Sequence, residues 1–143
     1  IKKGLIKAEL NEIFEKCDVI SLHSPLLKET EDMITIEQFS RMKENASFIN
    51  TARGKIINTE DLIKVFTNRR DLTAILDVTD PEPLREDSPI YDMDNIILSP
   101  HIAGSIGNET YLMGEMMYEE LVRYINGGDL KYQISQEDFR RMA

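Results

Sequence analysis

Cysteine is nearly absent from the sequence, and no apolar run is long enough to cross a membrane. A lone Cys17 excludes an intramolecular disulfide and a cysteine metal centre, which fits a reducing compartment such as the cytoplasm, where we expect the protein. A membrane-spanning helix needs about 18–20 consecutive apolar residues, so none is predicted. The chain also opens without a basic segment followed by an apolar one, so no signal peptide is indicated.

Basic residues are fewer than acidic residues in this sequence. The 17 Lys and Arg residues face 26 Asp and Glu residues, which gives a formal net charge of -9 and a pI near 4.7. A surface this acidic repels nucleic-acid phosphates and anionic lipids, so we expect neither a nucleic acid nor a membrane as partner. The 143 residues, 41% hydrophobic and 30% charged, predict one soluble domain with a real core.

Short apolar runs alternate with amphipathic stretches along the chain. The apolar runs predict strands at residues 19–22, 46–50, 72–78 and 95–99, and the amphipathic stretches predict helices at residues 7–16, 35–42 and 108–125. A further helix starts at Asn58 or Thr59, either of which would cap it. Apolar strands separated by helices predict an α/β fold, with a parallel sheet that is covered on both faces.

Helix ends are marked by local signals. Thr35 with Gln38 three residues later predicts a capping box, and Asn126-Gly127-Gly128 predicts the end of the long helix. We therefore place one domain at residues 1–128. The amphipathic tail, residues 129–143, has no evident partner face, and we expect it to dock elsewhere in a longer protein. A start at Ile1 instead of Met supports the same interpretation, a fragment or a processed product.

Chemically versatile side chains follow the predicted strands, where ligands bind in an open parallel α/β sheet. The residues at these strand ends are His23, Arg53, Asp77 with Glu82, and His101. A guanidinium binds a carboxylate through two parallel hydrogen bonds, an imidazole exchanges a proton near neutral pH, and a neighbouring carboxylate fixes the imidazole tautomer. Together these groups suit a 2-oxo acid that is held by its carboxylate and protonated on the ketone oxygen while hydride reaches the carbon.

An ordered set of motifs resembles the successive signatures of the D-isomer-specific 2-hydroxyacid dehydrogenases. The resemblance runs from about Lys7 to the end of the chain, and the order and spacing of the motifs are those of the family. The motifs are Leu22-His23-Ser24-Pro25-Leu26, Asn50-Thr51-Ala52-Arg53-Gly54, Leu76-Asp77-Val78 with Asp80-Pro81-Glu82-Pro83-Leu84, and Ser99-Pro100-His101-Ile102-Ala103-Gly104.

The resemblance implies a role for each matching position. Arg53 corresponds to the arginine that binds the substrate carboxylate, His101 to the general acid/base, and Glu82 to its carboxylate partner. Asp77 corresponds to the residue that contacts the nicotinamide carboxamide. The remaining implied cofactor-binding positions are His23, Pro25, Thr51, Ala52 and Gly104, the last because a glycine permits close approach to the nicotinamide.

The resemblance also implies an incomplete protein. The fold would be a partial Rossmann-like, doubly wound sheet with a long C-terminal helix. No Gly-x-Gly-x-x-Gly turn follows a strand, so we expect the phosphate-binding half to precede residue 1. The isolated chain is then predicted to bind its cofactor poorly and to be inactive. NAD is the expected cofactor of the full-length protein, with NADP open, and a homodimer the expected assembly.

Three other functions compete with this interpretation. His23, Asp77, Glu82 and His101 would form a mixed metal site, but no paired-histidine spacing supports it and we predict no metal. A serine hydrolase would need a Gly-x-Ser-x-Gly elbow, which the sequence lacks. The remaining alternative is a non-catalytic, dehydrogenase-like binding or regulatory module, against which the joint presence of Arg53, Glu82 and His101 argues.

Overall fold

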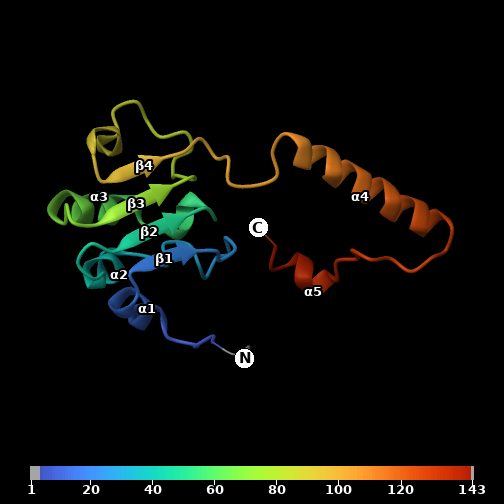
Figure 1. The fold of residues 1–143 in the computed structure, drawn as a ribbon, viewed down its shortest axis with the longest axis horizontal. Helices are drawn as coiled ribbons and strands as arrows, with labels where there is room; N and C mark the ends of the chain where they lie inside the picture. The colour runs from blue at the N-terminus through green and yellow to red at the C-terminus, as the bar shows by residue number, and fades with distance from the viewer. Residues whose placement is uncertain (1–3, 143) are drawn as a thin grey trace. The chain divides into compact units, whose positions relative to one another are not determined.

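The computed structural model describes residues 4–142, which form two compact units divided between His101 and Ile102. The first unit is a four-stranded parallel sheet of order β1-β2-β3-β4 (Figure 1). Its strands are β1 (Val19–Leu22), β2 (Ser47–Asn50), β3 (Thr73–Leu76) and β4 (Ile96–Leu98). The predicted α/β class and all four strands are confirmed, each within two residues of its expected ends.

Three helices connect or precede these strands. They are α1 (Leu10–Lys16), α2 (Ile36–Arg41) and α3 (Thr59–Asn68), and the short 3-10 helices η1 (Gly54–Ile56) and η2 (Pro89–Asp92) lie in the loops before α3 and β4. Thr35 and Gln38 form the predicted capping box, and Asn58 caps α3 by accepting from Asp61 N at 3.1 Å. Helix α1 begins three residues later than predicted, after Glu9, which is extended and makes no capping bond.

The core lies between these helices and one face of the sheet. Phe14 of α1, Phe39 of α2 and Phe48 of β2 pack with ring centroids 5.2–6.2 Å apart, and Phe66 of α3 meets Phe39 edge-on at 5.7 Å. Such edge-to-face contacts stabilise a core beyond the area that they bury. Figure 1 shows α1, α2 and α3 stacked beside the sheet in the order of the strands.

Within residues 4–101 the described helices cover one face of the sheet. Burial alternates along β1, β2 and β3, so that one face lies under the helices and the other is more open. Val19 is 60% exposed and Ile97 is 54% exposed. Continuous apolar strands therefore predicted the sheet correctly, but their outward side chains are not covered by the described elements of this unit.

The second unit contains α4 (Asn108–Ile125) and α5 (Gln136–Phe139). Helix α4 ends as predicted: Gly127 has a φ of 66°, in the left-handed region that favours glycine. The carboxylate of Glu120 accepts from Tyr132 N at 3.0 Å, which lowers the pKa of Glu120 and ties the following segment to the helix. The docking of residues 129–143 on another domain stays a prediction. Among residues 4–142, no helix has the length and apolar character needed to span a bilayer.

Arg69 and Asp71 clamp the end of α3 to the loop before β2. The Arg69 guanidinium donates to Asp71 through Nε at 2.9 Å and Nη2 at 2.6 Å, and both terminal nitrogens reach the Met42 carbonyl at 3.3 Å. The Arg69 hydrogen bond is the main cause that lowers the pKa of Asp71 from 3.8 to about 2. Because the folded pKa lies below the unfolded one, this stabilisation is present above about pH 4 and is lost as the pH falls toward 2.

We expect Asp71→Asn to lower the free energy of unfolding by about 1–2 kcal/mol at pH 7, the upper value following from the pKa shift and the lower one from solvent screening. The loss should shrink between pH 5 and about 2. Urea unfolding across this range measures it. Asp87→Asn is the matched control, because the Arg85–Asp87 pair has the same spacing but is largely exposed. An equal loss in both variants would contradict the assignment.

Candidate active site

The carboxyl ends of the four strands are aligned. Leu22, Asn50, Leu76 and Leu98 are the last strand residues and are neighbours in the sheet register. Whatever follows each strand therefore leaves the sheet at the same edge, which is where ligands bind in open parallel sheets. The residues that follow are His23, Thr51, Asp77 and Ser99.

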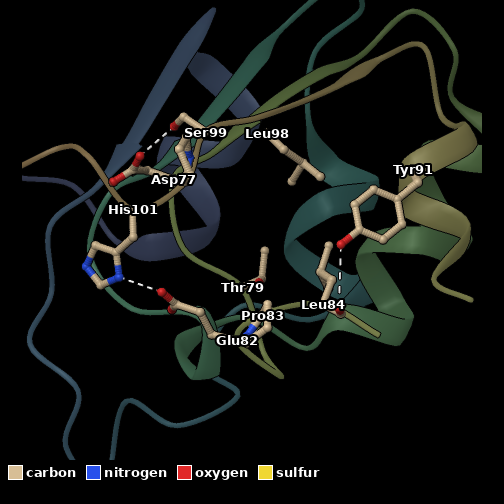
Figure 2. Close-up of a pocket in the computed structure, with 10 residues that line it drawn as sticks. Asp77, Thr79, Glu82, Pro83, Leu84, Tyr91, Leu98, Ser99 and His101 are labelled. Carbon is tan, nitrogen blue, oxygen red and sulfur yellow. Dashed lines mark hydrogen bonds and ion pairs between the residues drawn. The ribbon is translucent and has the colours of Figure 1, made fainter. Parts of the chain in front are cut away.

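Glu82 and His101 form a pair at this edge. His101 Nδ1 lies 2.5 Å from Glu82 Oε1, although 19 residues separate the two in the sequence (Figure 2). Both side chains remain accessible, with 48% of His101 and 41% of Glu82 exposed. An ionised carboxylate only accepts hydrogen bonds, so it fixes the proton on Nδ1 and assigns Nε2 to exchange with a ligand.

The backbone of His101 is itself unusual. Its φ is 52°, a left-handed conformation that a non-glycine residue rarely adopts and that costs on the order of 1 kcal/mol. His101 N donates to the Ser99 carbonyl at 3.0 Å, which closes a tight turn around Pro100 directly before this residue. Strained residues of this kind cluster at functional sites, where the turn aims a side chain that regular structure would direct elsewhere.

Asp77 is a buried carboxylate beside this pair. It is 4% exposed, and its Oδ1 accepts from Ser99 Oγ at 2.5 Å across the ends of β3 and β4. A charged group at this depth requires hydrogen-bonding partners, because desolvation otherwise makes the ionised form costly. Asp77 is therefore held in a set orientation at the sheet edge.

These groups line one cavity of about 560 Å³. Figure 2 shows Asp77, Ser99 and His101 at one side of it, and Leu84 and Tyr91 at the other. A mainly apolar wall with a few oriented polar groups is typical of a site for a small ring. It therefore fits a nicotinamide ring with its polar carboxamide. No glycine-rich phosphate-binding turn occurs among residues 4–142, so they fit the ring half of a dinucleotide and not its pyrophosphate.

Arg53 lies in the loop that follows β2. The buried Asn50 side chain shapes this loop, since its amide donates to the Arg53 carbonyl and accepts from Ala52 N, both at 3.0 Å. The Arg53 guanidinium is exposed, and Nη1 donates to the Ala52 carbonyl at 2.7 Å. It does not line the cavity, so the structure brings together Asp77, Glu82 and His101 but leaves Arg53 outside that group.

Gly54 fixes the distance between this loop and the loop after β3. A Cβ at Gly54 would lie 2.0 Å from the Thr79 carbonyl oxygen and 2.6 Å from Asp80 N, far inside contact distance. Thr59 Oγ1 donates to the Asp80 carbonyl at 3.0 Å and holds the same approach from the start of α3. Only a residue without a side chain permits the two loops to pack this closely.

The other predicted cofactor residues lie outside the cavity lining. His23 Nε2 is 2.7 Å from Ser21 Oγ, and the Pro25 carbonyl accepts from Thr30 Oγ1 at 2.7 Å. Thr51 and Ala52 are partly buried in the loop after β2, and Gly104 is exposed in the second unit. No group of three or more His, Cys, Asp or Glu side chains within residues 4–142 is arranged to hold a metal ion.

Asn50 and Ser99 are site residues to which sequence analysis gave no role. Asn50 ends a buried strand at an inward position, and a polar residue there is the signal that was available. Ser99 carried no such signal, because its contact with Asp77 depends on the pairing of two strands that are distant in the sequence.

Comparison with known proteins identifies the family of the chain. Residues 1–103 match the family described as D-isomer specific 2-hydroxyacid dehydrogenase, NAD binding domain. The chain is 38% identical over 119 residues to a glyoxylate reductase of Thermofilum pendens, and 35% identical over 134 residues to one of Korarchaeum cryptofilum. These alignments cover 83% and 94% of the chain but 35% and 40% of the relatives, so the chain spans about two fifths of their length.

Solved structures share the fold. A D-lactate dehydrogenase of Lactobacillus jensenii with NAD+ aligns with a TM-score of 0.77 at 30% identity, over 90% of this chain and 43% of that one. A D-isomer specific 2-hydroxyacid dehydrogenase of Xanthobacter autotrophicus Py2, in complex with NADPH and MES, aligns with a TM-score of 0.75 at 28% identity, over 88% and 51% of the two chains. The expected Rossmann-like fold is thereby confirmed.

Proposed function

The chain belongs to the D-isomer specific 2-hydroxyacid dehydrogenases, as part of their NAD-binding domain, and on this premise we propose that the full-length protein interconverts a 2-oxo acid and a 2-hydroxy acid. The observation that carries the proposal is the Glu82–His101 pair, which lies beside the buried Asp77 carboxylate in one cavity. Because the relatives include glyoxylate reductases, glyoxylate is the first substrate to test.

In the proposed reaction a bound nicotinamide would supply a hydride to C2 of the oxo acid. His101 donates a proton from Nε2 to the ketone oxygen, so that carbonyl and proton become a hydroxyl group. Glu82 holds the opposite ring nitrogen and stabilises the imidazolium form that donates. In the reverse direction His101 accepts the hydroxyl proton through the same nitrogen.

In this proposal Arg53 binds the substrate and Asp77 binds the cofactor. The exposed Arg53 guanidinium recognises the substrate carboxylate through two parallel hydrogen bonds, and it does so from the loop that Gly54 packs against Thr79. Asp77, to which Ser99 Oγ donates, would hold the carboxamide of the nicotinamide. The other predicted cofactor-binding positions keep the roles that the family resemblance implies. His23, Pro25, Thr51 and Ala52 would line the cofactor, and Gly104 would permit close approach to the nicotinamide.

We further propose that the full-length protein is a cytoplasmic homodimer without a nucleic-acid or membrane partner, as composition and family resemblance predict. The isolated 143-residue chain would be inactive, because residues 4–142 provide no cradle for the pyrophosphate. NAD is the proposed cofactor, and NADP stays a second outcome because one structural relative was solved with NADPH.

The test is a panel of 2-oxo acids with NADH and NADPH on the full-length protein and on the 143-residue chain. We expect the full-length protein to oxidise NADH with at least one acid, measured as loss of NADH absorbance, and the short chain to show no turnover. Turnover by the 143-residue chain would contradict the proposal that this chain is inactive without the part that binds the pyrophosphate. A folded full-length protein that turns over no acid would instead favour the binding or regulatory module.

A further inference from the structure

Ser99 makes three hydrogen bonds beneath the site, and two of them join the end of β3 to the end of β4. Its N–H donates to the Leu76 carbonyl at 3.0 Å, which extends the β3–β4 pairing by one residue. Its hydroxyl donates to Asp77 Oδ1 at 2.5 Å, and its carbonyl accepts from His101 N at 3.0 Å. One residue therefore contacts both groups that the proposed reaction places around the nicotinamide and the ketone.

We propose that Ser99 is a positioning residue that sets the Asp77 carboxylate and the His101 turn relative to each other. This inference rests on the proposed function and deepens it, because it assigns the side chain of Ser99 to cofactor binding and its backbone to acid/base placement. Ser99 itself touches neither reacting atom in this proposal.

The Ser99 hydroxyl orients the Asp77 side chain by donating a hydrogen bond to it. The bond runs from Ser99 Oγ to Asp77 Oδ1, so the hydroxyl is the donor. Hydrogen bonds to a charged acceptor are about twice as strong as neutral ones, and this one lies where Asp77 is 4% exposed. Without the hydroxyl the carboxylate loses this donor.

The Ser99 carbonyl contacts His101 through the backbone. The bond from His101 N closes a turn around Pro100, directly before the residue with a φ of 52°, and it depends on the backbone of Ser99 and not on its side chain. Replacing the side chain therefore separates the two roles. The cofactor should be held less tightly, whereas the pH dependence of the proton transfer, which reports on His101 and Glu82, should stay in place.

The experiment compares Ser99→Ala and Ser99→Thr in the full-length protein, with Ser40→Ala on the exposed surface of α2 as the matched control. NADH affinity is measured by fluorescence titration without substrate, and the pH profile of kcat is measured separately. We expect Ser99→Ala to raise the Kd for NADH by about tenfold, the equivalent of one charge-assisted hydrogen bond. Ser99→Thr keeps the hydroxyl and should restore most of the affinity, and neither variant should move the pH profile.

A double-mutant cycle with Asp77→Asn makes the test specific. If Ser99 acts through Asp77, Ser99→Ala should add little to the Kd in the Asp77→Asn background. Independent, additive effects, or a Ser99→Ala variant that loses thermal stability at unchanged NADH affinity, would overturn the inference. A full-length protein that neither binds NADH nor reduces any acid would overturn the proposed function, and this inference with it.

Discussion

Replacing His101 by asparagine in the full-length protein is expected to lower kcat for 2-oxo acid reduction by about 100- to 10,000-fold, the range that a positioned general acid contributes. The amide cannot donate the proton that Nε2 would supply to the ketone oxygen. NADH affinity should change little, since the cofactor contact is proposed for Asp77. Steady-state kinetics and fluorescence titration separate the two effects.

Glu82→Gln tests the partnership within the same site. The neutral amide cannot stabilise an imidazolium at Nδ1 as a carboxylate does, so we expect a smaller loss of kcat than for His101→Asn. Glu86→Gln changes an exposed residue of the same loop outside the cavity lining, and should leave kcat unaltered. If Glu82→Gln behaved like Glu86→Gln, the 2.5 Å contact would have no part in the proton transfer.

The second large effect is expected at Gly54. Gly54→Ala places a methyl group 2.0 Å from the Thr79 carbonyl oxygen, so the backbone of one loop must move. Overpacking of this kind costs about 1–3 kcal/mol, and contact with a backbone atom puts the cost at or above the upper end. We expect a loss of about 3 kcal/mol in the free energy of unfolding, measured by urea denaturation, together with impaired turnover in the full-length protein.

Gly114→Ala is the matched control for that substitution. Gly114 lies within α4, and a Cβ there meets no described atom within 4 Å. Alanine also favours the helix by about 1 kcal/mol over glycine, so stability should stay the same or rise. A similar loss in both variants would show that the close approach of Gly54 to Thr79 is not the cause.

The sequence by itself determined the four strands, the helices α1 to α4 and their order. Strands of four to seven apolar residues, the Thr35–Gln38 capping box, and the glycines after Ile125 are local signals, and the structure confirms each of them. It also predicted which residues would carry chemistry, because polar groups directly after buried strands are unusual. The start of α1 was wrong by three residues, since amphipathic spacing continues through residues that do not form the helix.

Only the tertiary structure decided which of these residues meet. Strand register places Ser99 against Asp77, and the loop after β3 brings Glu82 to His101 across 19 residues, whereas Arg53 remains outside their cavity. The need for glycine at position 54 arises from a carbonyl 25 residues further along the chain. Local sequence encodes φ, ψ and hydrophobic period, but contacts between distant segments depend on how completed strands and loops pack, and no local pattern specifies that packing.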